Sequence, residues 1–146
     1  GAERDQLMAE KEARGLTNVV FAPPQPKSEM PRVWSLCDAA LVHLKDSPTF
    51  GEVIPSKIFE AMASGLPIVL AAPAGEAGAI VEKHAAGLWV PAEKPDLLAA
   101  AVRRLMADAD GRAAMAQAAL TAAPEYSRET QAQRMLDVFA GVCGGG

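Results

Sequence analysis

The sequence has 146 residues, the length of one domain. Half of the residues are hydrophobic and 22% are charged, which is the balance of a globular protein with a core. The formal net charge is −4 and no block of Lys or Arg occurs, so nucleic acid is excluded as an expected partner. A small phosphate-bearing ligand stays possible, because helix N-termini bind anions without a basic patch.

The elements alternate between helix and strand along the chain. Four apolar segments are predicted strands: residues 18–21, 39–44, 67–72 and 87–90. Predicted helices span residues 3–14, 28–36, 55–64, 75–83, 96–107, 112–122 and 128–140, with a loop at 46–54. Apolar strands separated by helices predict a doubly wound parallel sheet, an α/β fold of Rossmann type.

The printed sequence opens on a helix, with no strand or Gly-rich turn before it. A doubly wound sheet usually starts with a strand that leads into the first helix. We therefore expect residues 1–143 to form a Rossmann-like domain that is incomplete at its N-terminus, a piece of a larger protein. Residues 144–146 are expected to be a flexible Gly tail.

The two cysteines, Cys37 and Cys143, lie far apart, and neither belongs to a CxxC pair or has a neighbouring His. This pattern argues against a disulfide or a zinc site and favours a reducing cytosolic compartment. Cys37 is expected to be a small core residue. No signal-peptide pattern and no apolar run of about eighteen residues occur, so neither export nor a membrane span is expected. No metal site or cofactor is expected.

The segment from Gly51 to Val69 contains the residues most typical of a ligand site. Gly51 permits a close backbone approach or a positive φ. Pro55 favours the first helical turn, whose N–H groups have no partner within the helix. This helix follows a strand and a loop, so its N-terminus points to the carboxyl edge of the sheet, where open α/β sheets bind ligands.

Two carboxylates in this segment, Glu52 and Glu60, are separated by seven residues. A helical projection puts Ile58 and Met62 on one face and Ser56 and Glu60 nearly opposite. Glu60 is therefore outside the core stripe, where it could accept two hydrogen bonds from a vicinal diol such as a ribose.

The alternative is that both glutamates are solvated, with Lys57 and Glu60 forming an ordinary i,i+3 pair. Spacing alone favours this alternative. Lys57 could equally neutralise phosphate charge.

Other candidate residues are expected to have structural roles and not to bind a ligand. The Gly75–Gly78 segment lacks the full G-x-G-x-x-G pattern and is predicted to be a strand-to-helix turn. His43 and His84 have no neighbouring acid in the sequence to orient them. Trp34 and Trp89 are expected to be core aromatics.

The glutamate pair, followed by Ala61-Met62-Ala63-Ser64-Gly65-Leu66-Pro67, resembles the E-x7-E motif of glycosyltransferase family 4. Residues 15–21, 37–42 and 86–91 resemble further segments of this family, so the resemblance covers most of the chain. Residues 55–60 are closest to the fucosamine-transferase-like branch.

The resemblance implies the C-terminal, donor-binding domain of a GT-B fold. Glu60 would bind the donor ribose, Glu52 would contact the hexose as the catalytic residue, and the nucleobase would lie against the turn from Ala22 to Gln25. The implied donor-binding set is Gly51, Val53, Ile54, Ser56, Lys57, Glu60, Ala22 and Gln25.

The resemblance also implies a retaining, metal-independent transfer of a hexosyl group from a UDP-linked donor. The acceptor would be lipid-linked or a polysaccharide, bound by a missing N-terminal domain, with peripheral association at the inner face of the plasma membrane. The isolated chain is expected to hold a nucleotide sugar but not to transfer the sugar. Two alternatives remain open: a nucleotide-sugar epimerase of GT-B architecture and a non-catalytic nucleotide-binding module.

Overall fold

The computed structural model describes residues 3–143, so the predicted Gly tail at 144–146 lies outside the described residues. The chain divides into two compact units, Gly1–Met30 and Pro31–Gly146.

In the first unit, helix α1 (Arg4–Ala13) is followed by an extended stretch and the short 3-10 helix η1 (Lys27–Glu29). The guanidinium of Arg4 lies 5.8 Å from the ring centroid of Phe21 and donates to the carbonyl of Ala22 at 3.4 Å. The strand predicted at residues 18–21 is wrong, since these residues join no sheet. The described part of this unit contains no strand to pair with them, and an apolar segment becomes a strand only through ladder hydrogen bonds.

The second unit contains a parallel sheet of three strands, β1 (Ala40–His43), β2 (Ile68–Ala72) and β3 (Gly87–Pro91). The sheet order is β1-β2-β3, with Ile68 of β2 in register with Ala40 on one side and Gly87 on the other. All five residues of the central strand β2 are buried, which explains its continuous apolar run. The predicted parallel α/β fold is confirmed, with three described strands where four were predicted.

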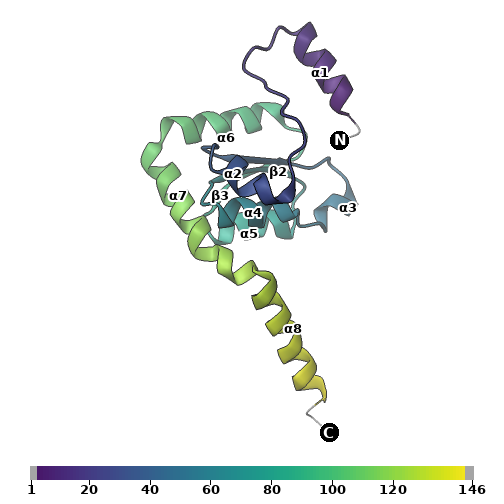
Figure 1. Cartoon of the computed structure of the whole chain (residues 1–146), viewed down its shortest axis with the longest axis vertical. Coiled ribbons are helices and arrows are strands. Elements are labelled where there is room, and N and C mark those ends of the chain that lie inside the picture. Colours follow the sequence, from purple (N-terminus) through teal and green to yellow (C-terminus); the bar gives the residue numbers. More distant parts are fainter. Residues whose placement is uncertain (1–2, 144–146) are drawn as a thin grey trace. The chain divides into compact units, whose positions relative to one another are not determined.

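Helices cover both faces of this sheet (Figure 1). Helix α2 (Met30–Trp34) begins at the last residue of the first unit, and the helical segments that follow it are α3 (Pro48–Gly51), α4 (Ser56–Ala63), α5 (Glu76–Lys83), α6 (Pro95–Ala107), α7 (Ala109–Ala122), η2 (Ala123–Tyr126) and α8 (Arg128–Cys143). The main core joins α4, α5 and α7 to one face of the sheet, and a smaller core joins α6 to the other face. This two-sided cover is Rossmann-like and fits the expected C-terminal domain of a GT-B fold.

Three local predictions need correction. The loop predicted at 46–54 contains α3, because Ser47 accepts a hydrogen bond from the N–H of Phe50 and caps a short helix. Helix α7 begins before residue 112, because Asp108 caps it through the N–H of Gly111 at 2.8 Å. Cys37 is exposed and lies beyond the end of α2, so it is not a core residue. No helix among residues 3–143 is long and apolar enough to cross a membrane.

Candidate functional site

The carboxyl ends of the three strands lie at one edge of the sheet, because all three strands are parallel. Three loops leave from this edge: residues 44–55 after β1, 73–75 after β2 and 92–94 after β3. The first of these loops contains α3, and we call residues 44–55 the donor loop, after the donor-binding role that the family resemblance implies for them. Most of the predicted site residues belong to this loop or to the helix α4 that follows it.

Most polar residues of the donor loop are exposed, and two of its apolar side chains, Leu44 and Ile54, pack against the main core. Glu52 follows the last residue of α3 and is exposed, and the side chain of Val53 is 40% exposed. Ile54 is half-buried and packs against the main core, as does Phe59 in α4. These two positions are those of a hydrophobic staple, which fixes the direction in which a chain enters a helix. Gly51 has no positive φ, so of the two predicted reasons for glycine only a close backbone approach remains, and it stays a prediction.

Helix α4 begins at the carboxyl edge with free backbone donors. Its N-cap is Pro55, with φ −65° and ψ 129°, and no side chain caps the helix. In the first turn, Ile58 donates its N–H to the carbonyl of Pro55 at 3.0 Å, whereas the N–H groups of Ser56 and Lys57 have no carbonyl one turn earlier in the helix to bind. Such a helix start carries a partial positive charge that suits an anion. Ser56 and Lys57 in this turn are both exposed. A helix start of this kind suits a phosphate group.

Glu60 lies one turn further along α4, outside the core. Ile58 and Met62 are fully buried while Glu60 is exposed, so the helical projection is confirmed. The hydroxyl of Ser56 donates to Oε1 of Glu60 at 3.3 Å. In the part of the chain that the structure describes, no ion pair joins Lys57 to Glu60. The carboxylate thus keeps accepting capacity for a ligand with paired hydroxyl groups.

Two contacts join the donor loop to the neighbouring loops, and sequence analysis foresaw neither. The N–H of Asp46 donates to Oε1 of Glu93, 47 residues away, at 3.2 Å. A Cβ added at Gly75 would collide with the carbonyl oxygen of Gly51. Gly75 connects β2 to α5, so the Gly75–Gly78 segment does begin as the predicted strand-to-helix turn.

Comparison with known proteins gives the family of the chain. Residues 1–121 match the family model described as Glycosyl transferases group 1. The chain belongs to this glycosyltransferase family. The match extends over most of the chain, including the donor loop and α4.

Curated relatives of this glycosyltransferase chain are named D-inositol 3-phosphate glycosyltransferase. The protein of Corynebacterium urealyticum is 30% identical over 95% of the chain, and that of Salinispora tropica is 31% identical over 95%. The protein of Salinispora arenicola is 31% identical over 86% of the chain. The matches cover 32%, 28% and 27% of these relatives, so the chain spans between a quarter and a third of their length.

The predicted nucleobase contacts belong to the other compact unit of this glycosyltransferase chain. Ala22 and Gln25 are both within residues 1–30, where the side-chain amide of Gln25 donates to the carbonyl of Pro23 at 3.2 Å. Their nucleobase role stays a prediction.

Trp34, Trp89 and His84 have the structural roles that the sequence predicts. Trp34 and Trp89 both pack against the main core, and the indole N–H of Trp89 donates to the carbonyl of Ala72 at 3.1 Å. His84 is largely buried and lies 2.8 Å from the hydroxyl of Tyr126. Burial, and then the charge of nearby Glu125, raise the pKa of Tyr126 above its ordinary value of 10.0.

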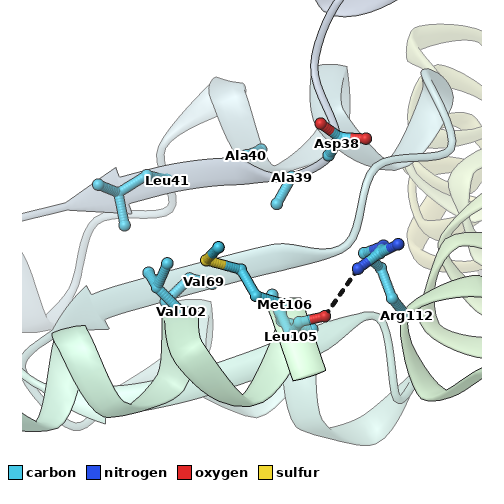
Figure 2. A pocket seen from close by; sticks show the side chains of 9 residues that line it. All are labelled: Asp38, Ala39, Ala40, Leu41, Val69, Val102, Leu105, Met106 and Arg112. Carbon is cyan, nitrogen blue, oxygen red and sulfur yellow. Dashed lines mark hydrogen bonds between the residues drawn. The ribbon is translucent and has the colours of Figure 1, made fainter. Parts of the chain in front are cut away.

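A groove of about 240 Å³ lies at the opposite end of the sheet (Figure 2). It lies between the amino-terminal end of β1 and the C-terminal half of α6, with Arg112 at one side, and its lining is mainly apolar. The guanidinium of Arg112 donates to the carbonyl of Leu105 at 2.9 Å. The groove is separate from the donor loop and contains none of the predicted site residues.

Proposed function

We propose that this chain is the donor-binding part of a retaining glycosyltransferase, and that it binds a nucleoside diphosphate sugar, UDP-linked, at the donor loop and α4. One observation supports this most directly. An uncapped helix N-terminus and an exposed carboxylate one turn later share one helix, at the sheet edge where α/β folds bind ligands. A nucleoside diphosphate presents the matching groups, an anionic diphosphate and a ribose diol.

Each residue receives a role that follows from its position. The Glu60 carboxylate accepts from the ribose hydroxyls, and the amides near Val53 and Ile54 meet the diphosphate with those of the first turn of α4. Lys57 adds a positive charge beside the same turn. Glu52, exposed after α3, contacts the hexose. Negative charge develops on the departing diphosphate in the transition state, so oriented amides stabilise that state more than the bound donor.

The identity of the acceptor is the more specific part of this proposal. Sequence analysis expects a lipid-linked or polysaccharide acceptor and a protein at the inner face of the plasma membrane. The name of the relatives points instead to D-inositol 3-phosphate. We place this small phosphorylated polyol first, with the lipid-linked acceptor as the alternative to test beside it. The fucosamine-transferase-like branch stays a prediction, and the names of these relatives give it no support.

Calorimetric titration of the 146-residue chain with UDP tests the donor proposal. UDP should bind more tightly than uridine, because only UDP offers a diphosphate to α4, and UDP should compete with UDP-glucose for one site. Uridine and inorganic diphosphate serve as matched controls for the two halves of the ligand. Circular dichroism checks that the chain is folded. A folded chain that shows no UDP binding in calorimetry contradicts the proposal.

The two alternative functions differ in what the longer protein does with a bound donor. An epimerase of GT-B architecture would convert the UDP-sugar to its epimer without any acceptor. A non-catalytic module would bind the donor and leave it intact. Incubating a protein that includes this chain and its flanking sequence with UDP-glucose, with and without D-inositol 3-phosphate, separates the three. Release of UDP that depends on the acceptor supports the transferase.

A further inference from the structure

The hydrogen bond between Asp46 and Glu93 crosses the end of the central strand. Asp46 lies after β1 and Glu93 lies after β3, while β2 runs between these two strands. The bond therefore joins loops from the two outer strands. Its donor is the backbone of the donor loop, only one residue before the Ser47 cap of α3. Because the N–H of Asp46 belongs to the backbone, this bond restrains the path of the donor loop in addition to the side chain of Glu93.

The backbone at Glu93 is unusual for the residue type it holds. Its φ is +57°, in the left-handed region that side chains with a Cβ disfavour. Glycine would occupy this position without strain. A glutamate here gives up backbone stability and provides a carboxylate within reach of Asp46.

The donor loop meets a neighbouring loop at a second place. The backbone of Gly75, after β2, lies so close to the carbonyl of Gly51 that any Cβ on Gly75 would collide with it. The φ of Gly75 is 170°, which any residue adopts, so the close approach alone requires glycine. The loop is thus held at Asp46, before α3, and at Gly51, the end of α3. Glu52 is the next residue along the chain.

We propose that Glu93 is a positioning residue for the donor site, which acts by holding the donor loop in the conformation that receives the diphosphate and the sugar. The inference rests on the proposed donor-binding function. A charge-assisted hydrogen bond to a backbone N–H is stronger than a neutral one. It reduces the conformational freedom of the loop before the donor arrives, so less ordering is needed on binding.

Three single variants test this role: Glu93→Gly, Glu93→Gln and, as a control, Glu129→Gln on α8, which is exposed and outside the three loops. Hydrogen exchange of the Asp46 amide, followed by NMR, measures the bond directly. Calorimetry with UDP measures its effect on the site. Thermal unfolding measures overall stability.

Glu93→Gly should speed exchange at Asp46 about tenfold and weaken UDP binding about fivefold, because the carboxylate acceptor is lost. Its Tm should be unchanged or higher, because glycine relieves the left-handed backbone. Glu93→Gln keeps an acceptor oxygen and should restore most of the exchange protection and affinity. A residue with only a structural role would change affinity and Tm in the same direction.

Unchanged exchange at Asp46 in Glu93→Gly overturns the proposal, as does unchanged UDP affinity when the wild-type chain binds UDP. If the wild-type chain binds no UDP, the donor-binding function fails and with it the positioning role. The exchange data then still show whether Glu93 orders the loop. The two failures are therefore distinguishable.

Discussion

The hydroxyl of Ser56 donates to Oε1 of Glu60 across one turn of α4, at 3.3 Å. This bond places the carboxylate on the same side of the helix as its first turn, away from the buried Ile58 and Met62. The proposed diol acceptor and the proposed phosphate-binding amides therefore come from one short helix. Packing of this helix against the sheet and α7 keeps their spacing constant.

Replacing Glu60 should remove the recognition of the ribose. Glu60→Ala is expected to weaken UDP binding by about 1–3 kcal/mol, because a ligand diol then loses an ionised acceptor. The specific measurement is the preference for UDP over 2′-deoxy-UDP, which calorimetry should find in the wild-type chain and not in Glu60→Ala. Glu129→Ala, at an exposed position of α8, is the matched control. An undiminished preference in Glu60→Ala would exclude the ribose role.

The contact between Gly51 and Gly75 predicts a strong asymmetry between two similar substitutions. Gly75→Ala should destabilise the chain by about 1–3 kcal/mol, because its Cβ would collide with backbone that has to move. Gly51→Ala should change stability by less than about 0.5 kcal/mol, since its Cβ meets Ala74 at an ordinary 3.5 Å. Urea unfolding of both variants measures the difference. Equal free energies of unfolding would contradict the described path of the loop.

The sequence predicted those parts of the fold that depend on local patterns. The apolar run of β2 and the helical projection of α4 are both visible in short windows, and the structure confirms each. Residues 18–21 show the limit of this reasoning, because their apolar pattern is that of a strand and they join no sheet. A strand depends on a partner that may be far away in the sequence or in another segment.

For the candidate site, too, the sequence predicted local features and missed contacts between distant residues. Exposure of Glu60 follows from helical geometry, so projection could find it. The bond from Asp46 to Glu93 spans 47 residues and depends on a left-handed backbone at a glutamate, which no sequence pattern indicates. The close approach at Gly75 could be suspected from the glycine, but its partner Gly51 could not be identified without the tertiary structure.

The end of α4 gives a prediction about stability that does not depend on ligand binding. Gly65 has φ +65°, and the N–H of Leu66 donates to the carbonyl of Ala61 at 3.0 Å, as in a Schellman motif. A Cβ at Gly65 would also lie 3.0 Å from Cδ1 of Leu120 in α7. Gly65→Ala should therefore destabilise the chain by about 1–2 kcal/mol for the backbone alone.

Gly141→Ala is the matched control for Gly65→Ala. Gly141 lies within α8 and has no heavy atom within 4 Å of an added Cβ. Alanine there should stabilise the helix by up to about 1 kcal/mol, because glycine is a poor helix former. Opposite signs for the two variants in urea unfolding are the expected result. A stabilising Gly65→Ala would contradict the left-handed end of α4.

Tyr126 should make the chain less stable in alkaline solution. Its ring stacks on Phe59 at 4.8 Å between centroids, and burial, followed by the charge of Glu125, raises the pKa of its phenol above 10.0. Above pH 10 the unfolded chain ionises this phenol first, while the folded chain still binds the proton. The folded state then binds more protons than the unfolded state, so stability falls as pH rises through the folded pKa.

The sequence contains a single tyrosine, so absorbance at the phenolate band reports Tyr126 alone. The titration midpoint should lie above 10.0 in the folded chain and return to about 10 in concentrated urea. Glu125→Gln should lower the folded midpoint, because it removes a negative charge that opposes ionisation, whereas Glu129→Gln should leave it unchanged. Tyr126→Phe should remove the loss of stability between pH 10 and the folded midpoint. A folded midpoint at or below 10.0 would show that the phenol is not desolvated, and the packing of η2 against α4 would then differ from the one described.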